Sequence, residues 1–350
     1  MRVFRLLLTA SLVLGAPCAA QEIADLRSQA GRLLGTPDPD TIEYPSGFPP
    51  TPAEIALGKT LFFDPRLSTD RTVSCATCHN PDLGLGDGLA RSHGVNGAPT
   101  PRNAPHLHNL AWTPLLFWDG RAASLEEQAL APIQAPGEMA MDLPVLLARL
   151  NGVPHYQQAF QEVYGAGPAT STHLASALAS FERSLVVRNT AYDRWQAGDD
   201  RALGPEAVRG LGLFLGKASC IDCHSGPNFS DGSFHNLGLG GTDRGRAAIV
   251  PGAAAEGAFK TPGLRNALLT APYFHDGRIE SLEAVVRFYN RGGDAPTPDP
   301  LVRPLGLTDR EVLDLVAFLG ALTEPLVIER PVLPPDGPCP PPVPGQGSRP

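Results

Sequence analysis

The chain has 350 residues, a formal net charge of −8, and 37 glycines and 37 prolines. This acidity argues against nucleic acid as a partner and suits a soluble protein that meets a basic one. The length is sufficient for two domains.

Residues 1–20 have the features of a secretory signal peptide: two arginines, an apolar run and small residues ending at Ala20. The apolar run is too short for a permanent membrane span. We therefore expect cleavage after Ala20, a periplasmic location and no membrane anchor. Cleavage would remove both arginines and take the formal net charge from −8 to −10.

Strand signals are scarce, and the apolar residues fall mostly in helical patterns. The longest pattern is expected to form one helix that bridges the two halves of the chain. The last pattern follows Thr308, a residue suited to cap a helix. Residues 331–350, which include Cys339, lack an apolar period and predict a disordered or polyproline tail. The helical segments are Leu57–Phe63, Thr172–Trp195, Gly210–Gly216 and Asp309–Leu322.

Two Cys-x-x-Cys-His motifs have the spacing of covalent haem attachment, in which two thiols bind the vinyl groups and the histidine ligates iron. A zinc ribbon would place its cysteine pairs about 15–20 residues apart, whereas 141 residues separate Cys78 from Cys220. A redox dithiol would not need a histidine after both pairs. The motifs therefore predict two haem c groups, attached through Cys75, Cys78, His79, Cys220, Cys223 and His224.

The two halves of the chain repeat each other's motifs. Pro101–Pro105 is echoed by Gly263–Ala267, and Phe117–Glu126 is echoed by Phe274–Glu283. Such self-similarity over about 150 residues indicates two related domains. We expect a mainly α-helical fold of two tandem cytochrome c-like domains, each around one covalently attached haem. The expected divisions are 1–20 (signal peptide), 21–45 (N-terminal extension), 46–195 (first haem domain), 196–330 (second haem domain) and 331–350 (tail).

From about Ile55 to Leu322, these motifs together resemble the bacterial dihaem cytochrome c peroxidase family, including its MauG-type branch. Glu138-Met139 and Thr270–Gly277 add to the resemblance. It implies an N-terminal haem that reacts with hydrogen peroxide and a C-terminal electron-transfer haem. It also implies a calcium ion between the domains, contacted by oxygen donors suited to a hard cation: Asn103, Thr270 and Pro272.

The second haem cannot take a methionine from its own domain, because the methionines are Met1, Met139 and Met141. The family's ligand position falls at Tyr289, and MauG-type members use a tyrosine there. Phenolate is a hard anionic donor that favours oxidised iron. We predict Tyr289 as the distal ligand, although a tyrosine taken alone would more often be a half-buried helix residue. The other candidates are His235, His275, Tyr273 and Lys217.

The resemblance assigns the acid–base group of the first haem to Glu138. A carboxyl in an apolar haem pocket would have a raised pKa. Without the resemblance, Glu138 would be interpreted as a solvated loop residue. Gln128 and Pro132 are expected to line the same pocket. Trp118 is expected as an aromatic step between the haems, which is compatible with an ordinary core tryptophan.

A distal histidine blocks the first haem in many of these peroxidases. The corresponding position falls on Val95, two residues from His93. We therefore expect His93 to be a surface-loop residue, although loops can shift. The first haem would then be open to peroxide without prior reduction.

Three functions are compatible with these residues. The first is a MauG-type enzyme that uses peroxide to form a high-valent haem state and oxidises a protein side chain or donor. The second is a detoxifying peroxidase supplied by a small periplasmic cytochrome or cupredoxin, and the third is a non-catalytic electron carrier. Tyrosine ligation favours the first. The substrate is open, because Lys217–Ser219 stands where MauG-type catalysis uses an exposed tryptophan.

Overall fold

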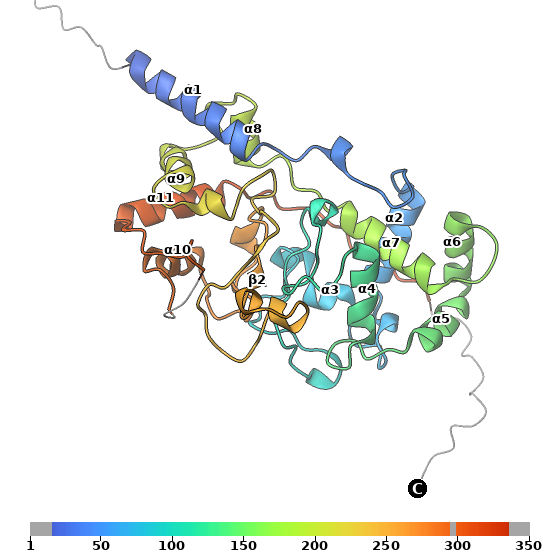
Figure 1. The fold of residues 1–350 in the computed structure, drawn as a ribbon. Helices are drawn as coiled ribbons and strands as arrows, with labels where there is room; N and C mark the ends of the chain where they lie inside the picture. Colours follow the sequence, from blue (N-terminus) through green and yellow to red (C-terminus); the bar gives the residue numbers. More distant parts are fainter. Residues whose placement is uncertain (1–15, 295–298, 336–350) are drawn as a thin grey trace, which may run out of the picture.

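The computed structural model describes residues 16–294 and 299–335. Most of the expected signal peptide and Cys339 lie outside these residues. Helices dominate the fold, as the sequence predicts (Figure 1). Two short strands pair antiparallel. The helices and strands are α1 (Ala16–Leu33), α2 (Pro52–Phe63), α3 (Cys75–Cys78), α4 (Leu125–Gln134), α5 (Leu143–Asn151), α6 (Pro154–Tyr164), α7 (Ser171–Arg183), α8 (Ala191–Gln196), α9 (Pro205–Leu215), β1 (Phe234–His235), β2 (Phe259–Lys260), α10 (Leu282–Asn290) and α11 (Asp309–Gly320).

One helix pair is built twice. In the first domain α2 crosses α7, and in the second α9 crosses α11. At the first crossing a Cβ on Gly58 would lie 1.8 Å from the Ala177 carbonyl oxygen, and at the second a Cβ on Gly210 would lie 2.0 Å from that of Asp314. Only glycine allows such close backbone approach. The repeated contact makes α7 the counterpart of the C-terminal helix α11.

Each pair belongs to its own hydrophobic core, and Figure 1 shows the two groups of helices side by side. The first core includes Leu61 and Phe181, and the second includes Phe214 and Phe318. On the two sides of the domain boundary, Leu185 is the last buried residue of the first core and Tyr192 is the next buried residue of the second core. Trp195, which the expected division places in the first domain, is buried in the second core.

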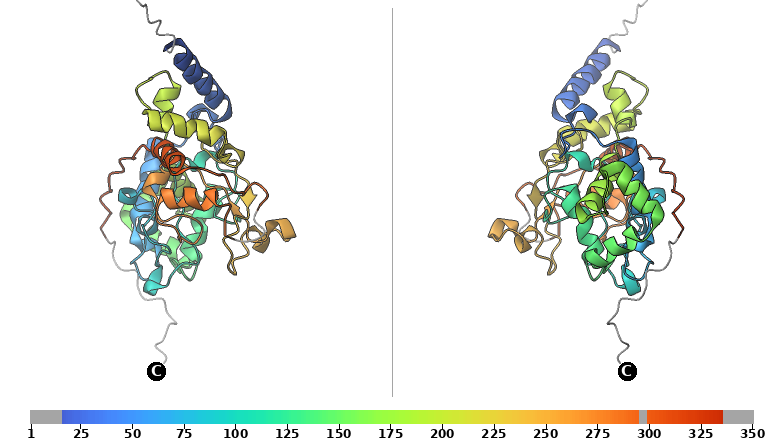
Figure 2. Two further views of the ribbon diagram at one scale, coloured as in Figure 1. Left: turned by 90° about the vertical axis from the view of Figure 1, so that its left-hand side faces the viewer. Right: turned by 90° about the vertical axis from the view of Figure 1, so that its right-hand side faces the viewer.

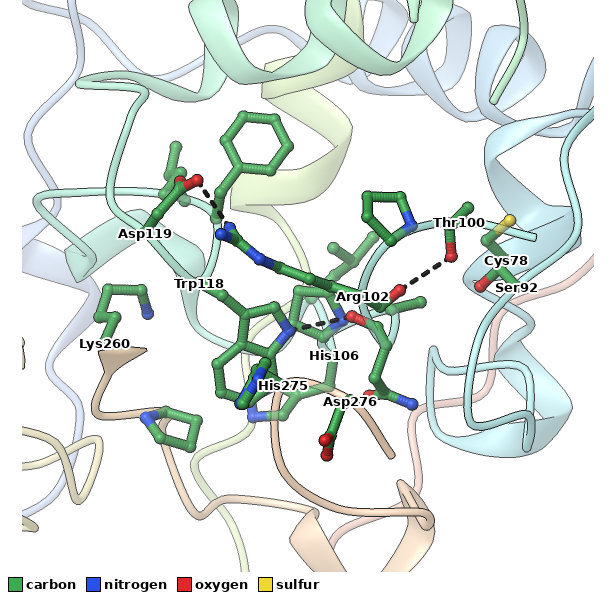
Figure 3. A pocket seen from close by; sticks show the side chains of 18 of the residues that line it. Cys78, Ser92, Thr100, Arg102, His106, Trp118, Asp119, Lys260, His275 and Asp276 are labelled. Carbon is green, nitrogen blue, oxygen red and sulfur yellow. Dashed lines mark hydrogen bonds and ion pairs between the residues drawn. The ribbon is translucent and has the colours of Figure 1, made fainter. Parts of the chain in front are cut away.

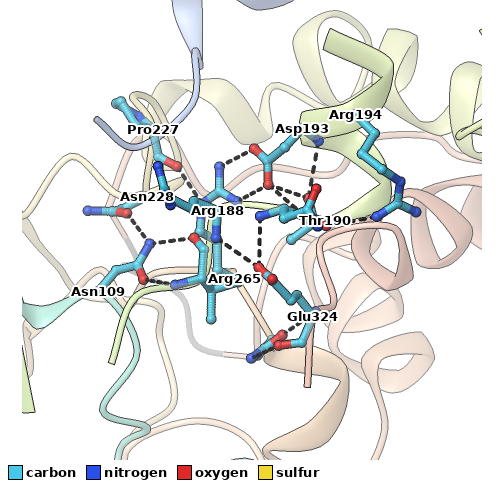
Figure 4. Close-up of polar contacts among 12 residues, drawn as sticks. Asn109, Arg188, Thr190, Asp193, Arg194, Pro227, Asn228, Arg265 and Glu324 are labelled. Carbon is cyan, nitrogen blue, oxygen red and sulfur yellow. Dashed lines mark hydrogen bonds and ion pairs between the residues drawn. The ribbon is translucent and has the colours of Figure 1, made fainter. Parts of the chain in front are cut away.

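The predicted single helix over 172–195 is wrong, because residues 184–190 separate α7 from α8. Asn109 holds this break by binding both the N–H and the carbonyl of Val187. The Glu324 carboxylate accepts hydrogen bonds from the N–H groups of Arg188 and Asn189 (Figure 4). Thr190 then begins α8 as its capping residue.

The expected N-terminal extension is an integral part of the second domain. Ala30 and Leu34 are buried in the second core, and the Gly226 N–H donates to the Leu33 carbonyl. The Arg27 guanidinium lies 4.6 Å from the centre of the Trp195 ring. Helix α1 runs across the expected cleavage position after residue 20. None of the described helices is long and apolar enough to cross a membrane.

After α11 the chain returns to the first domain, so residues 331–335 are not the disordered tail that the sequence predicts. Leu326, Ile328 and Leu333 pack against the first core. Arg66 donates a hydrogen bond to the Pro334 carbonyl, and Arg330 forms an ion pair with Asp82 at 2.5 Å. This extended segment has no helical period because it buries separate apolar residues along its length. The prediction for residues 336–350 lies outside the described residues.

In contrast, the predicted C-terminal helix is confirmed. It begins at Asp309, directly after Thr308, whose side chain accepts from the Glu311 N–H while Glu311 accepts from the Thr308 N–H. This reciprocal capping satisfies two backbone donors that the first helical turn leaves free. Helix α11 therefore presents Leu315 and Phe318 to the second core.

Candidate functional site

Both Cys-x-x-Cys-His motifs place their histidine in the same local setting. His79 follows α3, and its Nδ1 lies 3.1 Å from the Leu85 carbonyl. His224 follows a 3₁₀ turn, and its Nδ1 lies 2.8 Å from the Phe229 carbonyl. A carbonyl on Nδ1 leaves Nε2 available to a metal. Burial lowers the pKa of both histidines and so favours the neutral ring that binds metal ions.

The first motif opens onto a cavity of about 810 Å³. The structure brings the predicted residues of the first haem together in its lining: Cys78, His79, Trp118, Gln128, Pro132 and Glu138. Burial raises the pKa of Glu138, and the positive charge of Arg121 opposes that rise. This carboxyl therefore has the direction of pKa shift expected from the sequence.

A second loop supports the backbone of Glu138. The Val95 N–H donates to the Glu138 carbonyl at 2.8 Å, and a Cβ on Gly94 would lie 2.1 Å from the Gly137 carbonyl oxygen. Val95 is buried, whereas His93 is exposed and is absent from the cavity lining. The loop therefore turns His93 to the surface.

The second motif opens onto a narrower cavity of about 210 Å³. Cys220, Cys223 and His224 line it together with Tyr289, which comes from α10. The Tyr289 hydroxyl has no hydrogen-bond partner among the described residues. Burial raises the pKa of this phenol. Tyr289 is half-buried, and an unpartnered hydroxyl in the cavity lining fits a site where a metal supplies the missing partner.

The other candidate ligands of the second iron have contacts of their own. Tyr273 donates to the Ala267 carbonyl at 2.9 Å, and Lys217 forms an ion pair with Glu311 at 2.7 Å. The two ring nitrogens of His235 contact Asp299 and Asp231. His275 stacks on Phe259 with ring centres 3.6 Å apart, and its buried Nδ1 has no hydrogen-bond partner among the described residues, so it is the remaining rival of Tyr289 in the second cavity.

The residues of each cavity fit a covalently bound haem. Cys78 lines the first cavity, Cys220 and Cys223 line the second, and Cys75 packs against the first core. Each site also contains an imidazole oriented by a carbonyl and a polar side chain from a separate element: Glu138 in the first and Tyr289 in the second. Burial raises the pKa of all four cysteines.

The two cavities share a wall that includes Trp118, and Figure 3 shows this residue in the lining of the first cavity. The indole N–H donates to the Asn103 carbonyl at 2.9 Å, and the Lys260 N–H donates to the Trp118 carbonyl at 2.8 Å. His106 and His275 belong to the same wall. Trp118 is therefore held by backbone groups from both domains.

The expected calcium contacts lie at the second cavity, where Asn103, Thr270 and Pro272 all form part of the lining. The Asn103 amide donates to the Leu89 carbonyl, and the Thr270 hydroxyl donates to the Ala267 carbonyl. Within 16–294 and 299–335, no group of three His, Cys, Asp or Glu side chains is placed to hold a metal. A cation here would need amide, hydroxyl and carbonyl oxygens.

Sequence reasoning missed two groups of ion pairs beside the first cavity. Arg102 binds Asp119 and, across the domains, Asp243, whereas Arg265 makes a buried bidentate pair with Asp193 of α8 within the second domain (Figure 4). The two arginines occupy the same place in the repeated Arg-Asn-Ala motif. That repetition was the available signal, but the partner carboxylates lie far away in sequence. Sequence reasoning also did not identify Lys260, whose backbone N–H binds the Trp118 carbonyl.

The chain matches known proteins along most of its length. A family model described as di-haem cytochrome c peroxidase matches residues 52–201. Methylamine utilization protein MauG of Methylorubrum extorquens is 46% identical over 325 residues, which cover 91% of this chain and 90% of that protein. Cytochrome c551 peroxidase of Nitrosomonas europaea is 36% identical, with coverages of 82% and 85%.

Solved structures agree with these sequence matches. A MauG-like protein associated with microbial copper homeostasis superposes with a TM-score of 0.76 at 30% identity, covering 81% of this chain and 92% of that one. The dihaem peroxidase BthA of Burkholderia thailandensis gives a TM-score of 0.71 at 26% identity, with coverages of 83% and 89%. The mainly helical fold of two cytochrome-like domains is confirmed.

Proposed function

The chain belongs to the dihaem cytochrome c peroxidase family and is a haem oxidoreductase with two haem groups, and from this we propose that it is a periplasmic peroxidase of MauG type. Hydrogen peroxide reacts in the first cavity, and the oxidising equivalents are used on a protein electron donor or a protein side chain. The observation that carries this proposal is the unpartnered Tyr289 hydroxyl in the second cavity.

When bound, the haems supply the iron chemistry, with peroxide cleaved at the first and an oxidising equivalent held at the second. The two cysteines of each motif would attach a haem covalently, and His79 and His224 would be ligands of its iron. The contacts from the Leu85 and Phe229 carbonyls orient these imidazoles and increase their basicity.

Glu138 moves the proton during peroxide cleavage. Its carboxylate takes a proton from one peroxide oxygen and delivers it to the other, which leaves as water. Two electrons from the protein donor and two protons then complete the reduction of one peroxide to two waters. Burial raises the pKa of Glu138, so its carboxylate accepts the peroxide proton more readily than that of a solvated glutamate. Gln128 and Pro132, both from α4, narrow the cavity beside it.

Trp118 provides the path between the cavities, because its half-buried indole lines both. The indole N–H is bonded to a backbone carbonyl, and this contact fixes the ring in the shared wall. An aromatic ring in that place shortens each electron-transfer step.

Tyr289 sets the preference of the second site for oxidised iron. Burial raises the pKa of its phenol, which disfavours a free phenolate in this cavity. A metal cation reverses that preference, because it binds and stabilises the anion directly. Phenolate ligation would then favour ferric and more oxidised iron. This favours the storage of a strong oxidant over simple electron carriage.

A small redox protein is the second candidate partner, and one observation favours it. Lys217, paired with Glu311, stands close before the second motif where a surface tryptophan would serve a protein substrate. Trp195 is 1% exposed, and the Trp112 indole donates to Thr41. The chain would then detoxify peroxide with electrons from a small cytochrome or cupredoxin.

A calcium ion at the domain junction is part of the proposal. The Asn103 side-chain oxygen and backbone carbonyls near Thr270 and Pro272 would bind it. Removal of the ion by a chelator should weaken the contact between the domains and slow electron transfer between the haems.

The resting ferric protein tests this function. We expect a high-spin signal from the first haem and a low-spin signal from the second, without the charge-transfer band of methionine ligation. Tyr289→Phe should change the low-spin signal and leave the high-spin one. Two low-spin haems in the unaltered protein would favour an electron carrier or a peroxidase that requires reduction.

A further inference from the structure

A glycine-rich loop of the second domain covers part of the first cavity. It runs from residue 237 to 245 between β1 and β2, and Gly240, Gly241, Thr242 and Asp243 line the cavity that contains His79 and Glu138. The segment that follows the loop projects from the side of the molecule near residue 250 (Figure 2). The first cavity is therefore completed by the other domain.

The loop is fastened at Asp243. The Arg102 Nε donates to one carboxylate oxygen of Asp243 at 2.7 Å, and Nη2 donates to the other at 2.8 Å. The remaining Nη1 donates to Asp119 at 2.6 Å. A bidentate arginine–carboxylate pair is geometrically specific, so it holds the loop in one place against the first domain.

The two ends of the loop are also held. Near its start, the Leu239 carbonyl accepts a hydrogen bond from Arg278. Just after its end, Arg246 donates to the carbonyls of Asp119 and Gly120 at 2.9 and 2.8 Å. These contacts do not involve Asp243 side-chain oxygens. Removing the Asp243 carboxylate would thus free the middle of the loop while its ends stay attached.

The middle of the loop has little else to hold it. Gly240, Gly241 and Thr242 make no hydrogen bond to the described part of the chain. Gly240 and Gly241 have φ angles of +67° and +104°, and a Cβ on either would meet nothing within 4 Å. Adjacent glycines with open surroundings allow many backbone conformations. Asp243 is therefore the contact on which the position of this stretch depends.

We propose that the Arg102–Asp243 ion pair latches this loop as a lid and restricts the first cavity to small hydroperoxides. The proposal rests on the proposed function, in which peroxide reacts in the first cavity. With the latch removed, an organic hydroperoxide ROOH would enter, take two electrons from the reduced donor and two protons, and leave as ROH and water. The latch is then a specificity determinant that does not itself touch the reacting atoms.

Asp243 can be substituted without leaving a neighbouring charged residue unpaired. Without it, Arg102 keeps Asp119, and Asp119 keeps a second partner in Arg121 at 3.0 Å. No buried carboxylate of this cluster would be left without a cation. The Arg102 hydrogen bonds lower the pKa of Asp243 to about 2, so the pair is ionised throughout the neutral range.

The test compares Asp243→Asn with unaltered full-length holoenzyme. The assay measures kcat/KM for hydrogen peroxide and for cumene hydroperoxide with the same reduced donor. We expect the ratio of cumene hydroperoxide to hydrogen peroxide to rise about tenfold, the scale on which pocket shape discriminates between substrates. Glu256→Gln is the matched control, because it removes the exposed Arg244–Glu256 pair at the end of the same loop, where the backbone bonds of Arg244 and Arg246 to Gly257 and Ala258 remain, and its ratio should stay within about twofold.

A second measurement does not depend on turnover. Binding of imidazole and of 4-phenylimidazole to the ferric first haem is followed in the absorption spectrum. Asp243→Asn should tighten 4-phenylimidazole relative to imidazole, and Asp243→Glu, which keeps a carboxylate, should restore most of the discrimination. Hydrogen exchange of residues 237–245 should rise in Asp243→Asn and not in Glu256→Gln. Asp243→Ser replaces Asp243→Asn if the latter does not fold.

An unchanged substrate ratio with unchanged ligand discrimination would overturn the lid, whether or not loop exchange rises. Equal rates of the unaltered enzyme with both hydroperoxides would overturn it as well. Failure of the proposed function looks different, since hydrogen peroxide would then not react or Glu138→Gln would have no effect. The imidazole comparison still reports access to the first cavity in that case.

Discussion

Glu138→Gln removes the proposed proton-transfer group of the first cavity while keeping its size. The loss of activity should be large, because two neighbouring titratable groups, His106 and Asp119, are engaged in other contacts. The Nδ1 of His106 accepts from the His108 N–H, and its Nε2 contacts the Gly263 carbonyl at 2.9 Å. Burial lowers the pKa of His106 to about 4. Asp119 is paired with two arginines. His108 and His275 also line the cavity, and the Nδ1 atom of each is buried without a hydrogen-bond partner among the described residues. The residual rate of Glu138→Gln therefore measures any proton transfer through them.

We therefore expect kcat/KM for hydrogen peroxide to fall by about 10²- to 10⁴-fold, the usual contribution of a positioned acid–base group. Stopped-flow absorption of the first haem measures the peroxide step directly. Glu127→Gln is the matched control, because Glu127 lies on α4 and its exposed carboxylate accepts from the Ala123 N–H. A reduction of less than about tenfold in Glu138→Gln would refute the assignment.

The pH dependence gives an independent check. The carboxylate must be unprotonated to accept the peroxide proton, so kcat/KM should fall as the pH drops through the Glu138 pKa. Burial places that limb above the ordinary value of 4.5. Arg121→Gln removes the charge that lowers this pKa and should move the limb to higher pH. A limb that persists unchanged in Glu138→Gln would belong to another group.

Four further substitutions test separate parts of the structure. Trp118→Phe should slow electron transfer between the haems, measured by flash photolysis, and leave peroxide cleavage at the first haem intact; an unchanged transfer rate would exclude this path. Gly58→Ala should cost at least about 2 kcal/mol of unfolding free energy, because its Cβ would lie 1.8 Å from a carbonyl oxygen. Gly212→Ala in α9, which meets nothing within 4 Å, should instead stabilise by about 0.5–1 kcal/mol, as denaturant titration can verify. Burial raises the pKa of Glu182 to about 8, so the folded state keeps a proton that the unfolded state loses. Native stability should therefore fall as the pH rises from about 4.5 to 8, and Glu182→Gln should raise Tm at pH 8.5 relative to pH 5; equal shifts would contradict this reasoning.

The parts of the site that sequence predicts well are those whose chemistry is local. Each Cys-x-x-Cys-His motif forms one tight turn, so spacing alone places the thiols and the imidazole together. Helix α11 is equally local, because its cap and its apolar period lie within one segment. The placement of Glu138 and Tyr289 in their cavities depended on family resemblance as well, since neither has a local pattern of its own.

The parts that sequence missed depend on distant contacts. The break between α7 and α8 interrupts a helical pattern because Asn109 and Glu324, distant in sequence, bind its backbone. The helical spacing of apolar residues in one segment carries no information about such distant hydrogen-bond partners. The segment around Leu326 and Leu333 has the composition of a tail, yet its apolar side chains find the first core. The Arg102–Asp243 pair likewise joins residues from different domains.

The two cavities are completed by shared parts, and this explains how duplicated units can have different roles. The first cavity contains Glu138 from its own domain but is lined in part by the loop around Asp243 from the other. The second is much narrower and receives Tyr289 from its own helix α10. Trp118 stands between them, bonded through its carbonyl to Lys260 of the second domain. A change in the packing of the domains would therefore alter the lining of the first cavity and the position of Trp118 together. In the proposed function, this would couple peroxide entry to electron transfer.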